Sequence, residues 1–209
     1  AELLAWVLKR GRPSDEEIED ARGYIDTLRD PKLQLSFVKI RKNDNLVFLQ
    51  DEMYKLMRSL YEQGRMRYNV GQTYELIADF YEERKDVQAV KVAKMQKAPL
   101  MSSGFSKERA RLHSYQVEHV YYCLQAGYIR GIQAYYRAAE EAFQSNDQNL
   151  WLLLRDELLR FAKPLRGLKN EEPALNYIDA DIGVRWIKTN IANGDYDRAL
   201  QQIERFRES

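Results

Sequence analysis

Apolar residues recur at steps of three and four along most of this chain, and that spacing is typical of amphipathic helices. The clearest stripe runs from Leu46 to Gln63 and stops at Gly64, where a glycine is well suited to end a helix. Segments 174–193 and 196–207 repeat the pattern on either side of Asn193-Gly194-Asp195. Because such breaks are short, the pattern predicts helices joined in hairpins.

The turn residues of the chain set the ends of these helices. Gly11-Arg12-Pro13 ends a short N-terminal helix, and Ser14 with Glu17 forms a capping box that opens the next one. We expect an all-α fold of about ten helices, close to residues 1–10, 15–29, 31–41, 46–63, 74–81, 87–93, 107–126, 129–143, 150–162, 174–193 and 196–207.

Residues 31–49 allow two interpretations. Asp30-Pro31 suits a helix start, with the aspartate as the cap and the proline in the first turn. The alternation of apolar and polar residues over 33–37 suits a strand instead, and Asn43-Asp44-Asn45 would then turn a hairpin. We favour the helix because the neighbouring segments are helical, and the hairpin remains the alternative.

The C-terminal hairpin resembles a tetratricopeptide repeat. The residues that carry the resemblance are Trp186, Gly194, Tyr196, Ala199 and Ile203, which fall where that family places its small and aromatic signature residues. Ala199 is the small residue that allows two helices to approach closely. The resemblance covers residues 180–206 well and 106–208 loosely.

A fainter copy of the same pattern surrounds Tyr128, 68 residues before Tyr196, which is about twice the 34-residue period of that family. Where an intervening copy should fall, the chain instead reads Phe161-Ala162-Lys163-Pro164. The resemblance implies an α-solenoid of stacked helical hairpins. Generic helical hairpins unrelated to the family remain the alternative.

An irregular segment at 98–105, with Pro99 and Gly104, cannot continue a helix and is the predicted linker. It would divide a bundle-like or degenerate-hairpin region at 1–97 from a repeat region at 106–209.

The composition narrows the setting of the protein. The 33 basic residues nearly cancel the 32 acidic ones, so no global charge favours nucleic acid or membrane as the partner. The one cysteine excludes an intramolecular disulfide, and no apolar run approaches the roughly 18 residues of a membrane span. We therefore expect a cytoplasmic or nuclear protein in a reducing compartment. The chain opens without Met and closes within a helical pattern, so we expect a fragment of a longer protein.

Candidate chemistry is scarce. His119 and Cys123 are four residues apart and share a helix face, but two further zinc ligands are not evident, so we expect no metal. The sequence has no glycine-rich phosphate loop, nucleophile elbow or zinc-protease motif. We expect no cofactor and no enzymatic activity.

Tyrosine is the compositional oddity, with 14 residues, several of them around residue 128. These rings either fill the grooves between helices or line a partly wet binding groove. Tyr135 and Tyr136 are about 100° apart on a helix, so both cannot be buried on one face. The candidate partner-binding residues are Tyr128, Arg130, Tyr135, Tyr136 and Arg137.

Basic residues concentrate between positions 84 and 111, a segment that contains eight basic residues and only two acidic ones. The candidate basic patch consists of Lys91, Lys94, Lys97, Lys107, Arg109 and Arg111. Such a stripe binds phosphates of nucleic acid or an acidic peptide, or it is a solvated helix face. The function that we expect is a scaffold or adaptor that holds a peptide or helix of another protein in a helical-repeat groove, with RNA or other nucleic-acid binding as the alternative.

Overall fold

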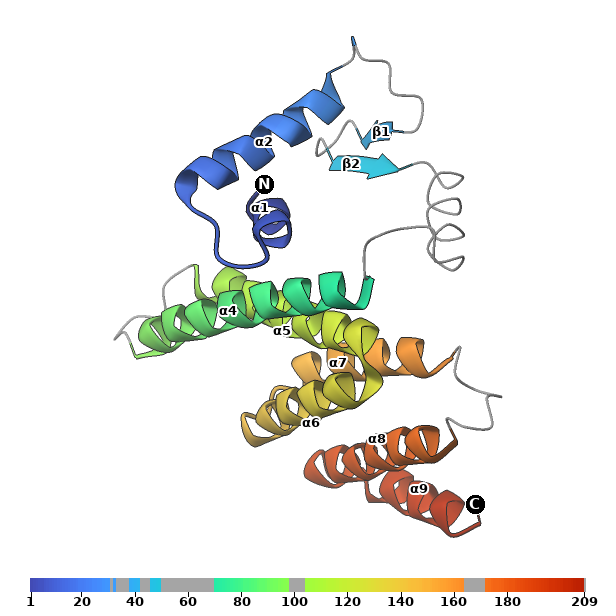
Figure 1. Cartoon of the computed structure of the whole chain (residues 1–209). Helices are drawn as coiled ribbons and strands as arrows, with labels where there is room; N and C mark the ends of the chain where they lie inside the picture. The colour runs from blue at the N-terminus through green and yellow to red at the C-terminus, as the bar shows by residue number, and fades with distance from the viewer. Residues whose placement is uncertain are drawn as a thin grey trace. The chain divides into compact units, whose positions relative to one another are not determined.

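The computed structural model describes residues 1–30, 32, 38–41, 46–49, 70–97, 104–163 and 172–208. These residues form eight helices and one pair of short strands, so the helical class that the sequence predicts is confirmed (Figure 1). The helices number eight in this part of the chain rather than the ten or so expected. Within the same residues, no helix is long and apolar enough to cross a membrane.

The chain divides into two compact units, residues 1–131 and 132–209, which we call unit 1 and unit 2. The predicted linker at 98–105 falls inside unit 1, and residues 98–103 lie outside the described part of the chain. The division of the chain at that segment stays a prediction.

Unit 1 begins with two helices whose ends follow from local chemistry. α1, Glu2–Lys9, closes at Arg10 in the left-handed conformation, with φ of 58°. α2, Asp15–Arg29, opens with the predicted capping box: the Glu17 amide donates to the Ser14 hydroxyl, and the Ser14 amide donates to the Glu17 carboxylate over 2.9 Å. Trp6 of α1 packs edge-on against Phe80, which lies in α4, Val70–Gln96.

The favoured helix at 31–49 is wrong. β1, Val38–Arg41, and β2, Leu46–Leu49, pair antiparallel, with Val38 opposite Leu49 and Arg41 opposite Leu46. Both strands are rich in β-branched and large apolar residues, which suit a pleated strand. The long helix expected from Leu46 therefore cannot start before residue 50, and residues 50–63 lie outside the described part.

A single long helix replaces the two short ones expected at 74–81 and 87–93. α4, Val70–Gln96, continues through the charged segment 82–86, because Glu, Arg and Lys are strong helix formers and no Gly or Pro interrupts them. α5, Phe105–Ala126, packs along it. Three contacts fix the antiparallel register at heptad spacing: Tyr74 with Tyr122, Tyr81 with Tyr115, and Gln88 with Glu108.

The turn from α5 into α6, Tyr128–Gln144, requires a glycine. A Cβ atom at Gly131 would lie 2.4 Å from the Cα atom of Leu124, which is closer than real Cβ contacts come. The missing side chain therefore lets the first turn of α6 approach the end of α5.

Unit 2 holds the rest of α6 and three further helices: α7, Gln148–Ala162; α8, Glu172–Ala192; and α9, Tyr196–Glu208. The predicted hairpin about Gly194 is confirmed. Gly194 has φ of 77°, and the Asp195 amide donates to the Asn190 carbonyl over 2.8 Å, which is the Schellman ending of a helix.

The turn between α6 and α7 has the same form as the one between α8 and α9. Asn146 takes the left-handed conformation with φ of 54°, and the Asp147 amide donates to the Ala142 carbonyl over 2.7 Å. Asp147 then caps α7 by accepting from the Leu150 amide. A hydrogen bond of 2.9 Å from the Gln148 side-chain Nε2 to the Asn193 Oδ1 joins the two turns.

Candidate partner-binding surfaces

The predicted partner-binding residues lie on α6 but do not share one surface. Tyr128 and Arg137 are exposed, and Arg130 forms an ion pair of 2.6 Å with Asp79. Tyr135 is 1% exposed, whereas Tyr136 is 45% exposed, as their separation around the helix predicts. Tyr135 therefore belongs to the core of unit 2 and is not available to a partner.

Tyr135 lies next to a buried charged cluster that ties α8 to α6. The Arg185 guanidinium is almost fully buried and bonds Asp181 over 2.9 Å and Glu140 over 3.2 Å. Its guanidinium also lies over the rings of Tyr136 and Phe143, 5.3 Å from each centroid. Burial raises the pKa of Tyr135, and the negative charge of Asp181 raises it further. The cluster has the geometry of a structural contact that holds α8 against α6.

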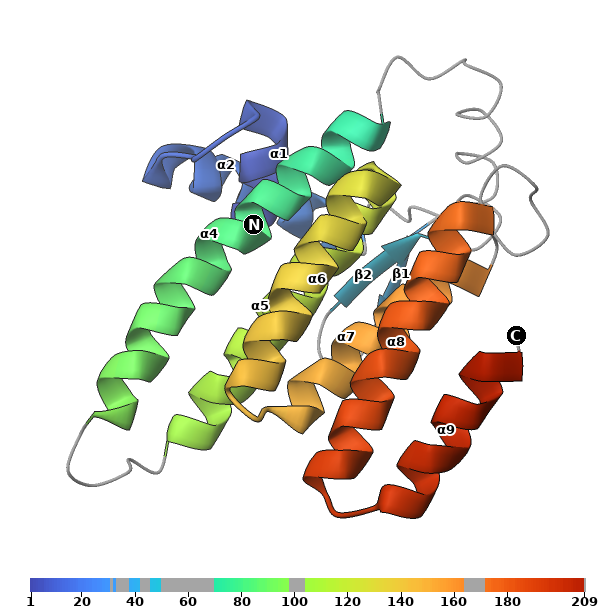
Figure 2. The same cartoon turned by 90° about the horizontal axis from the view of Figure 1, so that it is seen from below.

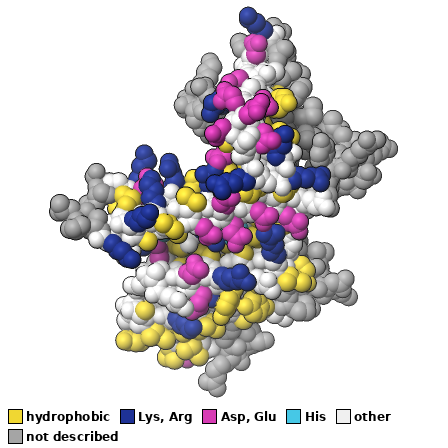
Figure 3. All heavy atoms as spheres, turned by 60° about the vertical axis from the view of Figure 1, so that its left-hand side comes forward, with side chains coloured by type: hydrophobic (Ala, Val, Ile, Leu, Met, Phe, Trp, Pro, Cys, Tyr) yellow, Lys and Arg dark blue, Asp and Glu magenta, His cyan; other side chains and the backbone are white. Residues whose placement is uncertain are grey.

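Part of the predicted basic patch is neutralised within unit 1. Glu108 forms an ion pair of 2.9 Å with Lys91 and lies 3.9 Å from Arg111. The hydrogen bond from Lys91, with a second one from Gln88, holds the pKa of Glu108 below its usual range. Lys94, Lys97 and Lys107 are exposed. In Figure 3, basic side chains gather where α4 ends and α5 begins.

His119 and Cys123 contact each other, as their spacing predicts. The His119 Nε2 and Cys123 Sγ atoms are 3.3 Å apart and buried. Burial lowers the pKa of His119 and raises the pKa of the Cys123 thiol. In the described part of the chain, no three His, Cys, Asp or Glu side chains are arranged to hold a metal ion. The pair is a neutral contact within unit 1.

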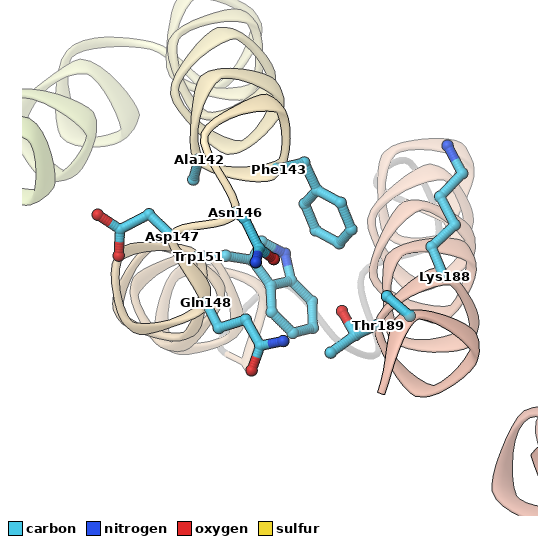
Figure 4. Close-up of a pocket in the computed structure, with 9 residues that line it drawn as sticks. Ala142, Phe143, Asn146, Asp147, Gln148, Trp151, Lys188 and Thr189 are labelled. Carbon is cyan, nitrogen blue, oxygen red and sulfur yellow. The ribbon is translucent and has the colours of Figure 1, made fainter. Parts of the chain in front are cut away.

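Two small pockets adjoin Trp151 near the joined turns of unit 2. One has a volume of about 130 Å³ and the other about 190 Å³, and both include Gln148, Trp151 and Thr189 in their walls. In Figure 4 the Trp151 ring lies between Phe143 and Gln148 of the smaller pocket, and the Lys188 ammonium points away from it. Drug-sized ligands occupy about 300 Å³ or more, so each pocket suits one side chain.

Large apolar side chains that are exposed on unit 2 form a stripe along α8. Tyr177, Val184 and Ile191 recur every seven residues and are 48%, 47% and 48% exposed. Seven residues make nearly two turns, so the three side chains lie within about 40° of arc. Arg185 and Ile178, which are buried, occupy another side of the helix.

α9 carries a matching stripe. Tyr196, Leu200 and Ile203 are 67%, 56% and 39% exposed, and they lie within about 60° of arc. Helical spacing puts these residues on one face with Ala199, and only Ala199 of the four is buried. α8 therefore covers little of the apolar face of α9.

Both stripes lie on the same side of the hairpin. Gly183 is buried on the side of α8 opposite Arg185, and α9 contacts α8. We infer that α9 packs on this side of α8, because Arg185 on the other side contacts α6. The α8 stripe is about 100° from Gly183 around the helix. The α9 stripe is about 100° from the buried face around Ala199. Because the two helices run in opposite directions, these rotations lead to the same side. Figure 2 shows α8 and α9 side by side, with no other helix of unit 2 in front of them.

We call this surface the α8–α9 face; it consists of Tyr177, Val184, Ile191, Tyr196, Leu200 and Ile203. Hydrophobic side chains gather at the lower edge of Figure 3, where these helices lie. Sequence reasoning missed the face because it did not consider Tyr177, Val184 and Ile191 as one stripe. The available signal was the seven-residue spacing of Tyr177, Val184 and Ile191. These residues lie on a different side of α8 from the buried Ile178 and Arg185.

Comparison of the chain with protein families, with curated proteins and with solved structures gave no match.

Proposed function

We propose that this protein is a non-enzymatic interaction module whose α8–α9 face takes up a helix of another polypeptide chain. The observation that carries the proposal is the exposure of six large apolar side chains on one side of one hairpin. Scattered exposed apolar residues are normal, but a contiguous patch of this kind marks an interaction site. A groove between two helices is a common seat for an amphipathic helix.

We also propose that the hairpins of unit 2 stack in the manner of tetratricopeptide repeats. The two turns support this, since both end a helix in the same way, one at Asn146 and the other at Gly194. In such arrays each hairpin buries its apolar face against the next hairpin. The α8–α9 face is then the kind of surface on which a further helix packs. On α6, Tyr136 and Arg137 remain candidates for contacts with a partner.

Two matched variants test the proposed function. Leu200 of α9 and Leu153 of α7 are both exposed, by 56% and 47%. We expect Leu200→Glu to abolish co-purification of partner chains from cells, because it places a charge in the α8–α9 face. Leu153→Glu should leave co-purification unchanged. Equal effects of the two variants, with both proteins folded by circular dichroism, would refute this site.

A second candidate function is phosphate binding by the basic patch. The exposure of Lys94, Lys97 and Lys107 favours it, and the ion pairs of Glu108 weaken it. If this function is correct, fluorescence anisotropy will detect RNA binding that falls steeply with salt and is lost in Lys94→Glu/Lys97→Glu. If wild type and variant bind RNA equally weakly, the candidate is excluded.

A further inference from the structure

The α8–α9 face has two outer edges of opposite charge. Lys188 lies beside the stripe of α8, on the edge away from α9, and is exposed. Asp197 and Glu204 lie beside the stripe of α9, on the edge away from α8, and both are exposed. These positions follow from the 100° advance per residue. None of the three residues forms an ion pair within the described residues.

Other charges near the face are already engaged. Asp181 is close to Lys188 around α8, but it is paired with the buried Arg185. Arg198 is paired with Asp195 over 3.3 Å. Among the residues whose side chains the structure describes, the charges left to meet a partner are thus one lysine on the α8 edge and two carboxylates on the α9 edge.

We infer that the chain which covers the α8–α9 face is a second copy of this protein; the inference rests on the proposed function of that face. Two copies related by a twofold axis parallel to the helices would place α8 of each over α9 of the other. The six apolar side chains would then meet the same six. Lys188 of each copy would lie beside Asp197 and Glu204 of the other, so the charges complement each other twice.

The helix levels along the axis agree with this pairing. α8 and α9 are joined by the turn at 193–195, so Ile191 and Tyr196 lie at similar heights. Counting back along α8 and forward along α9, Lys188 lies level with residues 199–200. Along the axis, Asp197 lies about 3–5 Å from that level and Glu204 about 6–8 Å from it, on the other side. A twofold axis along the helices keeps the height of every residue, so Lys188 reaches both carboxylates.

Exchange of these charges gives a sharp test by sedimentation velocity of the full chain over a range of concentrations. We expect wild type to dimerise. Lys188→Glu should weaken the dimer about tenfold or more, because like charges then meet at both contacts. Asp197→Lys/Glu204→Lys should weaken it similarly. An equimolar mixture of the two variants should form heterodimers, because each contact again joins opposite charges.

The triple reversal Lys188→Glu/Asp197→Lys/Glu204→Lys should restore the homodimer, which shows that neither variant failed through misfolding. A monomeric wild type, or a mixture no tighter than its parts, would overturn the second copy as the occupant. The proposed function is judged separately: partner chains of another kind whose co-purification is lost with Leu200→Glu would sustain it without a dimer. Insensitivity to Leu200→Glu would remove both.

Discussion

Two glycines show how one atom decides the effect of the same substitution. Gly131 and Gly23 both lie inside helices, but a Cβ atom meets the Leu124 backbone at 2.4 Å in one case and open space in the other. We expect Gly131→Ala to lower the free energy of unfolding by about 1–3 kcal/mol. Gly23→Ala should raise it by up to about 1 kcal/mol, because alanine favours the helix. Denaturant titration of both variants measures the difference, and a stabilising Gly131→Ala would contradict the close approach of α5 and α6.

His119 gives a pH dependence whose sign follows from its burial. Burial lowers the pKa of His119 in the folded protein below that of the unfolded chain, about 6.5. The charges of Lys85 and Arg130 lower it further, and those of Glu82 and Asp79 oppose them. Below pH 6.5 the unfolded chain binds a proton that the folded protein does not, so stability falls as pH drops through and below that value.

The measurement is the free energy of unfolding of wild type and His119→Gln at neutral pH and at about pH 5.5. His119→Gln should lose less stability over this interval than wild type does, whatever its stability at neutral pH. An identical loss in both proteins would show that His119 does not carry this pH dependence.

At the scale of the element, the contact of α6 with α8 depends on one buried arginine. The side chain of Arg185 is 5% exposed, Asp181 is 14% exposed and Glu140 is 42% exposed. Burial alone would lower the pKa of Arg185, but the hydrogen bond and charge of Asp181 raise it above its ordinary value. Replacement of the two carboxylates should therefore lower the free energy of unfolding by different amounts.

We expect Asp181→Asn to cost roughly 3 kcal/mol, because it leaves a buried charge poorly compensated. Glu140→Gln should cost about 1 kcal/mol or less, because that pair is largely solvated. Thermal unfolding of the two variants ranks them directly. A larger loss in Glu140→Gln would show that the solvated pair, not the buried one, holds the helices.

The elements that were predictable from sequence are those with strong local signals. The capping box of Ser14 and Glu17 and the turn at Gly194 were placed correctly, because each is fixed by a few adjacent residues. The strands at 38–41 and 46–49 were not, because helix and strand patterns fit the same residues and the pairing between the strands decided the outcome. The continuity of α4 was missed because its charged segment was taken for a break, although nothing in it disfavours a helix.

For the candidate sites, residue spacing predicted which side chains share a helix face, but not which other helices pack against that face. The burial of Tyr135 and the exposure of Tyr136 were predictable from their separation around one helix. The pairing of Lys91 with Glu108 was not, because it depends on the register of α4 against α5. The exposure of Leu200 depends on how far α8 covers α9, which no spacing within α9 reveals.

At the scale of the whole molecule, we propose that this chain contacts another polypeptide chain through its α8–α9 face. A photo-crosslinking amino acid at position 200 tests that claim in cells, with position 153 of α7 as the matched exposed control. We predict a light-dependent crosslink to a protein from position 200 and little or none from position 153, with mass spectrometry identifying a second copy or another chain. No crosslink from position 200, or equal yields from both positions, would contradict a contact between the α8–α9 face and another chain.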